Sequence, residues 1–523
     1  MPKAPTYAGV FIVTLATLMY EILLTRIFSV TMWYHFAFVA VSIALFGMTV
    51  GALLVYLKPT LFPSTRTQYH LALSALFFGI SAVLSFLTHL SIPFVPSRSL
   101  VFVYAVALTY AVVSIPFIFS GICVCLVLTR FPSHVSKLYA ADLVGAAAGS
   151  ILLIYLLEFT DAPTAVIVVG FLASAGAVCF AAEAGAARLG RVALIASLVL
   201  GASAGAHTVL VARQSPILRP VWVKGRFEPR PMYEDWNSFS RIRVSGDPDE
   251  PEEPMGWGLS PTYPSGRTVR QLHMDIDAAA STVLTAFNSD ARELEHLKFD
   301  VTNAVHYIRP GADVLVIGSG GGRDVLSALS FNQRSVLAVE VNQDIIDTVN
   351  RRFGTFTGHL DRLPNVAFVA DEARSYVARQ KRKFDIIQVS LIDSWAATAA
   401  GAYVLAENSL YTVEAWKLFL ERLTPTGVLT FSRWYVGDRP DEMYRLTSLA
   451  TAALRAAGWS SPAITSLSCG RSLGRVRGAP HVWVLGRCSS GKPRSLRGTS
   501  TSWGTCRRGC SSMSCSARDR RST

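Results

Sequence analysis

The sequence predicts two kinds of structure in one chain: a helical membrane domain, followed by an α/β domain built on a doubly wound parallel sheet. Its composition is apolar, with 51% hydrophobic and only 16% charged residues among 523, and the mean hydropathy is +0.36. Apolar segments of about 20 residues, the length that crosses a bilayer, fill positions 1–212. Beyond position 310, short apolar runs alternate with amphipathic ones, as strands alternate with helices in such sheets.

About seven segments of the first domain, residues 1–212, are long enough to span. The loops between them are short. Lys3 is the only early positive charge and further spans follow, so we interpret the first segment as an anchor rather than a cleaved signal peptide. The segments lie near residues 7–25, 34–57, 70–90, 100–129, 138–157, 163–185 and 192–211.

The positive-inside rule does not decide the orientation, because either choice places seven Lys and Arg residues in the cytoplasm. We expect the N-terminus outside and the C-terminal domain in the cytoplasm, because the ligand inferred below is intracellular. That expectation rests on the ligand and not on the charges.

Two carboxylates, Glu21 and Asp142, fall inside predicted spans, where an uncompensated charge costs several kcal/mol. Glu21 lies about one helical turn from Arg26, so an ion pair is the simpler interpretation. A polar cavity for a cationic or lipid substrate is the alternative. Gly145 and Gly149 have the Gly-x-x-x-Gly spacing that lets two helices approach closely.

The second region, residues 213–300, predicts a small β-element and a linker. The stretches "EDWNSFSRIRVSG" and "RQLHMDID" alternate polar and apolar residues as strands do. Between them, "DPDEPEEPMGWGLSPTYPSG" is an acidic, proline-rich loop. The stretch "DARELEHLKFDVTNAVHYI" predicts a helix that leads into the next domain.

The third region, residues 301–463, predicts the doubly wound sheet, because its strands are continuously apolar and separated by helices. We expect helices in "GRDVLSALSF", "QDIIDTVNRRFG", "EARSYVARQ" and "TVEAWKLFLERL". We expect strands in "DVLVIG", "SVLAVEV", "NVAFVAD", "FDIIQVSLID" and "GVLTFSRWY".

Each of the first four strands ends in residues suited to a ligand, and ligands bind beyond the carboxyl ends of such strands. The first ends in Gly318-Ser319-Gly320-Gly321-Gly322, where glycines let a ligand approach the backbone and a helix N-terminus offers N–H groups. The second ends in Glu340, an acid about twenty residues beyond the glycines that can accept both hydroxyls of a ribose. The third ends in Asp371 and Glu372, near where an adenine would lie, and the fourth ends in Asp393.

Two alternatives compete with a nucleoside site. A tight strand-to-helix turn without a ligand also needs glycines, but it does not explain the acids on the next strands. A nicotinamide dinucleotide would need a second mononucleotide half, for which the region is short. The loop also departs from G-x-G-x-x-G, because Arg323 replaces the third glycine.

The order "VLVIGSGGG…VLAVEV…NVAFVADEARSYV…FDIIQVSLIDS…LYTVEAWKLFLERLTPTGVLTFS" resembles the spermidine synthase, or polyamine aminopropyltransferase, family. "YEILLTRIFS", "LYAADLVGAAAG" and "WNSFSRIRV" resemble its bacterial branch with a multi-spanning N-terminal domain. The resemblance covers roughly residues 8–460. It implies a Rossmann-like sheet of the class I S-adenosylmethionine-dependent transferase type.

The family binds decarboxylated S-adenosylmethionine or methylthioadenosine, and the resemblance transfers these roles residue by residue. Gly318, Gly320 and Gly322 would line the nucleoside, Glu340 would bind the ribose, and Asp371 with its neighbour Glu372 would approach the adenine. Asp393 would orient and deprotonate the attacking amine, and a carboxylate can do both. Glu407 and Tyr411 are secondary site candidates. No metal is implied.

Two departures from the family concern the substrate. Soluble members carry Gly-Gly-Gly-Asp-Gly-Gly in the loop, and Gly321 stands at the position of that Asp. They also carry Asp-Ser/Thr-x-Asp-Pro after the fourth strand, where this chain has Ala396 and Ala397 in place of the second acid and the proline. The missing acids hold cationic amines in the family. The apolar segment Trp395 to Tyr411 is either a lid over a different acceptor or a plain cap on the sheet.

The tail, residues 464–523, loses all apolar periodicity. It holds eleven Arg and one Lys against one Asp, so it carries +11 of the net +13, together with five of the eight cysteines. We expect a reading-frame shift or a disordered segment, since such a composition builds no core. An RNA- or lipid-binding tail is the alternative. Translation of the other two frames after codon 464 tests the frame shift.

Three hypotheses of function follow. The first is a membrane-anchored transferase that moves an aminopropyl group from decarboxylated S-adenosylmethionine to an amine. The second is a methyltransferase that uses S-adenosylmethionine itself on an unknown acceptor. The third is a non-catalytic nucleoside-binding module that controls a membrane transporter. We expect a bacterial inner membrane location and no nucleic-acid partner, and we leave a homodimer open.

Overall fold

The computed structural model describes residues 1–33, 36–278, 280–392, 407–435, 441–458, 464–469, 479–486 and 513–516. Its contacts divide the chain into two compact units. The described residues of the helical unit fall within Met1–Arg243 and Asp275–Ala279. The α/β unit comprises Val244–Met274, Ala280–Ser394 and Leu405–Thr523.

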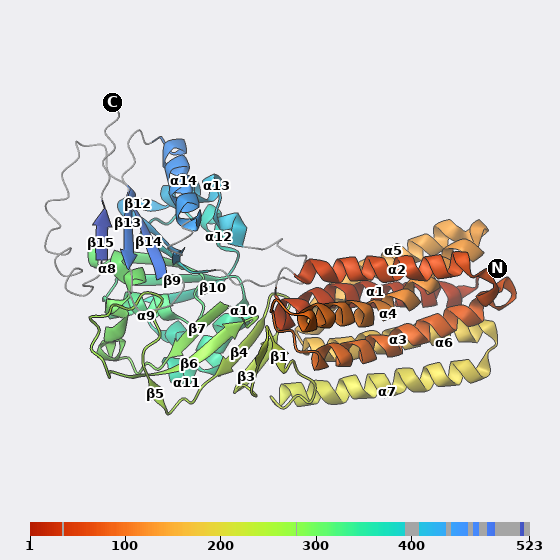
Figure 1. Cartoon of the computed structure of the whole chain (residues 1–523). Coiled ribbons are helices and arrows are strands. Elements are labelled where there is room, and N and C mark those ends of the chain that lie inside the picture. Colours follow the sequence, from red (N-terminus) through yellow and green to blue (C-terminus); the bar gives the residue numbers. More distant parts are fainter. Residues whose placement is uncertain are drawn as a thin grey trace. The chain divides into compact units, whose positions relative to one another are not determined.

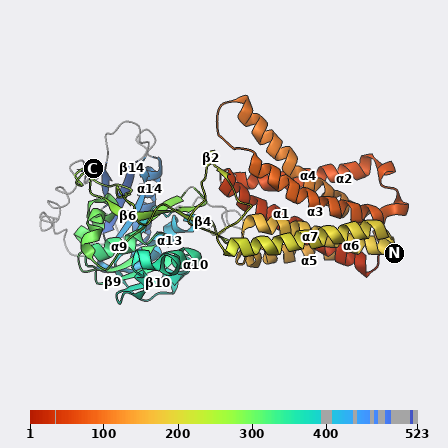
Figure 2. The same cartoon turned by 90° about the horizontal axis from the view of Figure 1, so that it is seen from below.

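Seven long helices build the helical unit, and their axes run roughly along one direction (Figures 1 and 2). Their sequences explain their bounds: α6, for example, begins where the Asp161 side chain accepts the N–H of Thr164, and it ends at Gly185 in the left-handed conformation. The seven helices are α1 (Ala4–Thr31), α2 (Ala37–Leu57), α3 (Thr67–Ser91), α4 (Leu100–Arg130), α5 (Val135–Leu157), α6 (Ala162–Ala184) and α7 (Ala187–Ala212).

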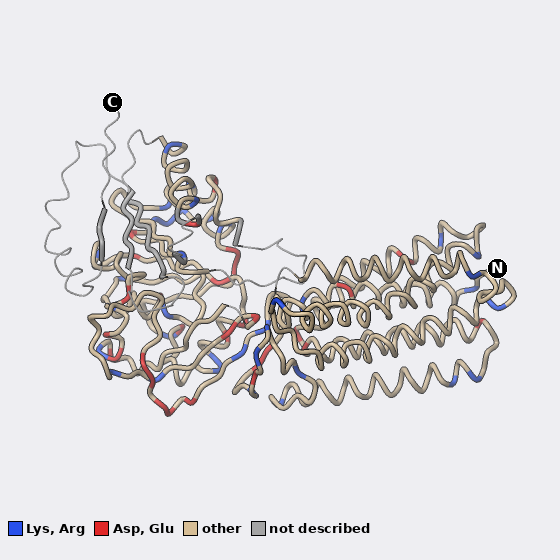
Figure 3. Tube along the Cα trace, in the orientation of Figure 1, with Lys and Arg blue, Asp and Glu red and all other residues tan. Residues whose placement is uncertain are grey.

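All seven helices are long and apolar enough to cross a membrane, within the residues that the structure describes. Large apolar side chains remain exposed along them, among them Leu45, Tyr56, Ile195 and Leu198. Figure 3 shows that the charged residues concentrate toward the helix ends and leave most of each helix uncharged. The prediction of about seven long apolar helices in this part of the chain is confirmed.

Glycines allow the helix pairs to pack closely. A Cβ added at Gly145 would lie 2.4 Å from the carbonyl oxygen of Phe11, and one added at Gly149 would lie 2.3 Å from that of Leu15. Both partners belong to α1, which therefore runs parallel to α5 in direct backbone contact. The predicted packing role of the Gly-x-x-x-Gly spacing is confirmed.

Short strands follow the helices. β1 (Trp222–Val223) and β2 (Arg226–Phe227) form an antiparallel pair. A five-stranded sheet has the order β3-β4-β6-β5, and β7 pairs with β6. Its strands are β3 (Tyr233–Trp236), β4 (Arg241–Ser245), β5 (Pro251–Glu252), β6 (Val269–Ile276) and β7 (Ala280–Thr285). The small β-element expected in this region is therefore present.

The helix expected after this sheet is not continuous. Residues Ala291–Phe299 form the 3₁₀ helix η5, Val301–Asn303 form η6, and only Ala304–Ile308 form an α-helix, α8. The break falls at Asp300, whose carboxylate accepts the N–H of Thr302 at 3.0 Å. A side chain that caps a new turn in this way ends the preceding one.

The α/β unit holds an eight-stranded sheet with the order β10-β9-β8-β11-β12-β14-β13-β15. The first five strands in this order are parallel, and β14 joins β12 antiparallel. The strands are β8 (Asp313–Ile317), β9 (Ser335–Glu340), β10 (Val366–Ala370), β11 (Phe384–Ser390), β12 (Leu423–Tyr435), β13 (Ile464–Cys469), β14 (Ala479–Gly486) and β15 (Met513–Ser516). The doubly wound parallel sheet is confirmed, because the chain starts at a central strand and adds strands outward in both directions.

Helices connect these strands at the predicted places. Those that follow β8 to β12 in the chain are α9 (Arg323–Ser330), α10 (Gln343–Asp347) with the π-helical turn η7 (Thr348–Arg352), α11 (Gly354–Thr357), η8 (Leu360–Arg362), α12 (Ala373–Arg379), η9 (Glu407–Leu410), α13 (Val413–Glu421) and α14 (Asp441–Ala456). One core cluster of this unit buries the β8, β9 and β11 face, including Leu315, Ile387, Trp416 and Phe431.

The tail differs from its expectation in one respect. Its segments 464–469, 479–486 and 513–516 form β13, β14 and β15, whereas the sequence pattern predicted no ordered element there. The other tail residues lie outside the described residues. The suggestion of a reading-frame shift remains a prediction.

Candidate functional site

The glycine-rich loop joins β8 to α9 by a backbone path that needs glycine. Gly318, Gly320 and Gly322 have φ angles of 77°, 47° and 83°, in the left-handed region that side-chain-bearing residues avoid. The N–H of Gly318 donates to the carbonyl of Val339 on the neighbouring strand at 2.8 Å. This bond fixes the beginning of the loop against the end of β9.

Glu340 lies at the end of β9 and faces this loop. Its carboxylate accepts the N–H of Gly320 at 3.2 Å and the N–H of Asn342 at 3.3 Å, and the residue is only 7% exposed. Burial raises the pKa of Glu340, although these backbone donors oppose the rise. The structure thus brings together two of the predicted elements, the loop and the acid after the second strand.

Gly321 is a glycine for a different reason. It has no left-handed φ, but a Cβ built on it would lie 2.2 Å from the carbonyl oxygen of Val283 and 3.1 Å from the hydroxyl oxygen of Thr282. Both neighbours belong to β7. The space that the family's acid would occupy in the loop is therefore filled by the backbone of another strand, and no side chain fits there without moving that backbone.

Asp371 and Glu372 follow β10. The N–H of Asp371 donates to the carbonyl of Glu340 at 3.0 Å, so the two strand ends are adjacent, and the Asp371 carboxylate pairs with Arg379. Glu372 is the N-cap of α12, where its carboxylate accepts N–H groups of Arg374 and Ser375 at 2.9 and 2.8 Å. Burial alone would raise the pKa of Glu372, but the bonds from Ser375 and Arg374 lower it. The structure gives Glu372 a capping role, and its role toward a nucleoside stays a prediction.

Of the two residues predicted to be catalytic, the structure describes one. Asp393 lies outside the described residues, and so do Ala396 and Ala397. Tyr411 is half-buried and lies two residues before the start of α13, with its ring 5.8 Å from that of Phe431 and 4.7 Å from the Arg433 guanidinium. These contacts place Tyr411 against β12, and its catalytic role stays a prediction. The side chain of Glu407 is not among those described.

A buried charged cluster behind the loop is not predicted by the sequence. Arg323, the first residue of α9, donates to Asp300 at 2.7 Å and lies over the ring of Trp257, 4.5 Å from its centroid. Burial would raise the pKa of Asp300, but Arg323 and the bonds from Thr302 lower it. The adjacent Asp324 shows the opposite balance, since burial raises its pKa to about 6. The signal in the sequence is the charged pair Arg323-Asp324 directly after the glycines, where Arg323 stands out only as the replacement of a third glycine.

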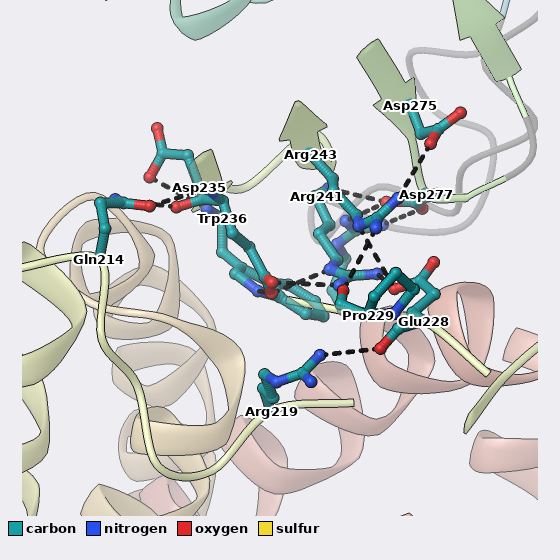
Figure 4. A network of polar contacts seen from close by, with 12 residues as sticks. Gln214, Arg219, Glu228, Pro229, Asp235, Trp236, Arg241, Arg243, Asp275 and Asp277 are labelled. Carbon is teal, nitrogen blue, oxygen red and sulfur yellow. Dashed lines mark hydrogen bonds and ion pairs between the residues drawn. The ribbon is translucent and has the colours of Figure 1, made fainter. Parts of the chain in front are cut away.

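A second charged cluster lies in the helical unit, and Figure 4 shows part of it. Arg241 donates to Glu234 at 2.9 Å and pairs with Glu228 at 2.8 Å, and its guanidinium lies over the ring of Trp236. Burial alone would lower the pKa of Arg241, but Glu234 and Glu228 raise it. Three of these residues, Glu234, Trp236 and Arg241, come from the stretch "EDWNSFSRIRV". The residue pattern of this stretch is therefore explained by a buried ion network.

The ion pair expected between Glu21 and Arg26 is wrong. Arg26 instead forms a two-bond pair with Asp277, 251 positions further along the chain, at 3.0 and 3.1 Å. Both side chains are fully buried. Glu21 was the expected partner because it is close to Arg26 along the chain. In the folded protein the carboxylate comes from Asp277, in a distant turn.

No group of three or more His, Cys, Asp and Glu residues suited to a metal ion occurs within the described ranges. The polar groups at the carboxyl ends of β8 and β9 include backbone N–H groups and the Glu340 carboxylate. Such groups suit the hydroxyls of a sugar and the polar edge of a base.

The comparisons with known proteins give partial likenesses. No family model matches the chain. Polyamine aminopropyltransferase 2 of Pseudomonas aeruginosa is 29% identical over 121 residues, which are 22% of this chain and 32% of that protein. The chain thus spans about a third of the length of this curated relative. Over these 121 residues, the match confirms the prediction that the chain is spermidine synthase-like.

Solved structures with a similar fold include two of the same kind. The spermidine synthase from Thermotoga maritima is 16% identical, with a TM-score of 0.31 over 49% of this chain and 72% of that one. A probable spermidine synthase from Corynebacterium glutamicum is 13% identical, with a TM-score of 0.35 over 55% of this chain and 91% of that one. The described part of the chain thus combines seven helices long and apolar enough to cross a membrane with an α/β unit that has a transferase-type fold.

Proposed function

We propose that the chain is a membrane-anchored, spermidine synthase-like transferase that binds an adenosyl sulfonium donor and transfers an aminopropyl group to an amine. The observation that carries this proposal is the contact between the Gly320 N–H and the buried Glu340 carboxylate at the carboxyl ends of β8 and β9. The relation to a polyamine aminopropyltransferase over 121 residues supports the reaction type.

The proposed reaction needs few protein groups. The amine nitrogen attacks the carbon bonded to the sulfonium sulfur, the carbon–sulfur bond breaks, and methylthioadenosine leaves with the electron pair. The proton of the amine passes to a carboxylate, a role that we assign to Asp393. The remaining task is to align nitrogen, carbon and sulfur, for which the glycine loop would fix the nucleoside end of the donor.

One observation favours a second candidate, methyl transfer from S-adenosylmethionine. At Gly321 the carbonyl of Val283 fills the space of the acid with which the family holds a cationic amine. A donor that keeps its carboxylate has less need of that acid, which would repel it. The methyl group would then pass to a nucleophilic acceptor and leave S-adenosylhomocysteine.

Calorimetry on the full chain in detergent tests both candidates. We expect binding of methylthioadenosine together with decarboxylated S-adenosylmethionine if the first candidate holds. Tighter binding of S-adenosylmethionine than of its decarboxylated form would replace aminopropyl transfer by methyl transfer. If none of the three nucleosides binds, the transferase proposal fails and a non-catalytic module is left.

Glu340 gives a sharper test of the same site. Glu340→Gln removes the charged acceptor of two ribose hydroxyls, so we expect affinity for methylthioadenosine to fall by roughly tenfold to a hundredfold. Asp347→Asn is the matched control, because Asp347 pairs with surface groups of its own helical turn. Equal affinity in Glu340→Gln and the wild type would remove Glu340 from the site.

The pH dependence of binding follows from the raised pKa of Glu340. In the free protein the carboxyl takes up its proton at a higher pH than an ordinary Glu, whose pKa is about 4.3. Protonation removes the charged acceptor, so affinity should fall as the pH decreases, and the fall should begin above that ordinary value. Glu340→Gln should abolish this dependence, which calorimetry at several pH values measures.

Location and partners belong to the same proposal. We place the α/β unit in the cytoplasm of a bacterial cell, since the donor is made there, with the helical unit in the inner membrane. The acceptor is a small amine in this proposal, and nucleic acid has no part in it. Protease protection of the α/β unit in right-side-out vesicles, with cleavage in inverted ones, is the expected result.

A further inference from the structure

One face of the sheet in the α/β unit carries a row of polar side chains. Gln388 and Ser390 lie on β11, and their register partners on β12 are Thr430 and Ser432. Successive residues of a strand point to opposite faces, so these four side chains share one face. The other face of the same two strands belongs to the apolar core cluster, with Ile387, Val389, Leu429 and Phe431. Apolar packing therefore does not explain the polar row.

Asp324 adds a carboxylate to this row. It is the second residue of α9 and is 5% exposed. The Gln388 amide donates to the Ser390 hydroxyl oxygen at 3.2 Å, and the Ser390 hydroxyl in turn donates to the Asp324 carboxylate. Its Oδ1 atom has no hydrogen-bond partner among the residues that the structure describes. The bonds therefore direct Asp324 toward the end of β11 and leave one oxygen for another donor.

Three further oxygens of the row lack hydrogen-bond partners in the part of the chain that the structure describes. They are the side-chain carbonyl oxygen of Gln388 and the hydroxyl oxygens of Thr430 and Ser432, and all three residues are buried. A buried polar atom without a partner costs about 1–3 kcal/mol. Proteins retain few such atoms, and a ligand, an ordered water or a chemical step is a common reason. Together with Asp324, these oxygens indicate a polar binding site.

The row ends beside the glycine loop. Ile317 of β8 and Val389 of β11 are register partners, so Gly318 and Ser390 follow them on neighbouring strands. A Cβ added at Gly318 would lie 2.6 Å from Cγ2 of Ile392, so the chain that leaves β11 packs against the loop. All of these residues belong to the α/β unit. A ligand at the end of β11 would therefore lie next to a nucleoside held by the loop.

The end of β11 has two further properties of a site. Ser390 is half-buried and bonded to the buried Asp324, so it connects this carboxylate with the surface. Leu391, the next residue, has a φ of 50°. A bulky residue rarely adopts left-handed backbone, and such strain is concentrated at functional sites. Ligands of open parallel sheets also bind at this edge.

We propose that Asp324 and Ser390 form the acceptor subsite of the transferase and bind the acceptor amine through its N–H groups. The Oδ1 atom of Asp324 accepts one of these N–H groups. The acid that the resembled family carries at the position of Gly321 is then supplied from three residues further along, at the start of α9. The proposal rests on the proposed function, and it adds the residues and the class of acceptor.

A single carboxylate sets the class of acceptor. Asp324 compensates one positive charge, and the Ser, Thr and Gln side chains of the row are uncharged. A second ammonium group, as in a polyamine, would enter among neutral side chains, and a buried charge without a partner is costly. The acceptor is therefore an amine with one basic nitrogen. Asp393 keeps its proposed role as the group that takes the proton.

Two amines of equal chain length test this class. Butylamine has one nitrogen and butane-1,4-diamine has two, and calorimetry measures their binding to the full chain in lipid nanodiscs. We expect butylamine to bind more tightly, and Asp324→Asn to weaken its binding about tenfold, because a bond to a charged group is lost. Tighter binding of the diamine would overturn the single-charge class. Equal butylamine affinity in Asp324→Asn and the wild type, or no binding of either amine, would overturn the subsite.

Thermal stability separates a binding acid from a structural one. Asp324→Asn keeps the shape of the side chain and removes a buried charge, so we expect the melting temperature to stay or to rise. A lower melting temperature with unchanged butylamine affinity would show that Asp324 only supports the packing of α9 on β11. That result would overturn the proposal.

Asp385→Asn is the matched control. Asp385 lies at the opposite end of β11 and accepts bonds from the Asp313 N–H at 3.0 Å and the Thr424 hydroxyl at 2.8 Å. Butylamine affinity in this variant should stay within about twofold of the wild type, as for independent sites. A fall equal to that of Asp324→Asn would show general loosening of β11 and would overturn the proposal.

The pH dependence of amine binding gives a further readout. Burial raises the pKa of Asp324 to about 6, with a contribution from Asp300, although Ser390 and Arg323 oppose the rise. The carboxyl loses its charge as the pH falls through this value, whereas an alkylamine stays protonated. Butylamine affinity should therefore decrease from about pH 7 to about pH 5. The same decrease in Asp324→Asn would assign it to another group and contradict the proposed role of Asp324.

Ser390→Ala provides a second variant in case Asp324→Asn does not fold. It removes a bond to the carboxylate and should weaken butylamine binding by a smaller factor. Methylthioadenosine affinity, measured on the same samples, separates this inference from the proposed function. A protein that binds methylthioadenosine, but whose butylamine affinity is the same in both variants, keeps the transferase function and overturns the subsite. A protein that binds butylamine through Asp324 but no nucleoside keeps the amine site and refutes the transferase function.

Discussion

Glycine serves opposite purposes in the two units of this protein. In the helical unit Gly145 and Gly149 have ordinary helical backbone, and their missing side chains let α5 touch the carbonyl groups of α1. In the α/β unit Gly318, Gly320 and Gly322 are needed for left-handed backbone in the loop between β8 and α9. Gly321 breaks this division, because it lies in the same loop and yet is required for close packing, like the glycines between α1 and α5.

Gly321 is explained differently by the sequence and by the structure. In the sequence it stands where soluble members of the resembled family carry an acid. In the structure it is a packing contact, because a Cβ atom at this position would lie 2.2 Å from the Val283 carbonyl oxygen. An acid could stand there only if β7 moved away. In the proposed function, the substrate preference therefore depends on the position of β7.

The largest effect is expected for Gly321→Ala. A methyl group at this position meets a backbone carbonyl that cannot rotate away, so we expect a loss of about 3 kcal/mol in the free energy of unfolding of the α/β unit. Methylthioadenosine binding should be lost as well, as measured by calorimetry. Gly321→Asp should behave no better. Binding of decarboxylated S-adenosylmethionine by Gly321→Asp would refute the packing explanation.

A smaller effect is expected for Gly149→Ala, the corresponding change in the helical unit. The added methyl group meets the Leu15 carbonyl, but two helices can separate slightly in a bilayer, so we expect about 2 kcal/mol of destabilisation. Thermal unfolding in detergent measures it. Donor affinity should stay unchanged, and a loss as large as that of Gly321→Ala would erase the distinction between the two packing glycines.

Gly318→Ala should have a mixed effect. The left-handed backbone costs an alanine about 1–2 kcal/mol, and the new methyl group would lie 2.6 Å from Cγ2 of Ile392, a side-chain atom that can move. We expect donor affinity to fall only partly, because the backbone N–H groups of the loop remain. Calorimetric titrations of Gly318→Ala and Gly321→Ala measure the loss of donor affinity at the two positions. A larger loss for Gly318→Ala would contradict the packing role given to Gly321.

The smallest effect is expected for Gly185→Ala at the end of α6. Its φ is 64° and nothing lies within 4 Å of an added Cβ, so only backbone strain of about 1 kcal/mol applies. Gly185→Asn should cost less, because Asn tolerates left-handed backbone. The difference between the two melting temperatures isolates the strain, and equal values would show that strain is not the reason for this glycine.

Local patterns predicted most of the fold, because its elements follow from intervals of a few residues. Apolar windows located the seven long helices, and continuous apolar runs located the parallel strands. The acids at the strand ends were found by position alone, and the contact between Glu340 and the loop agrees with that placement. The prediction of one continuous helix after the small sheet was wrong, because Asp300 caps a new turn. The periodicity of the sequence does not reveal such a cap.

The parts that could not be predicted depend on contacts between distant residues. Arg26 finds its partner 251 positions away, so the nearby Glu21 was the only candidate visible along the chain. Arg323 and Asp300 pair across a shorter interval, but their side chains meet only once the intervening chain has folded. Val283 explains Gly321 only after β7 has been placed beside the loop. Asp393, the predicted catalytic acid, lies outside the described residues.

The bonds that Glu183 forms with Lys3, Thr6 and Gln68 have a practical consequence for experiments on orientation. A reporter protein fused immediately before Lys3 would pull on the start of α1 and disturb the junction of three helices. The turn at Gly185 belongs to the same end of the bundle, is exposed and has open space around it. A small epitope inserted there would report which side of the membrane this end faces and leave the helices as they are.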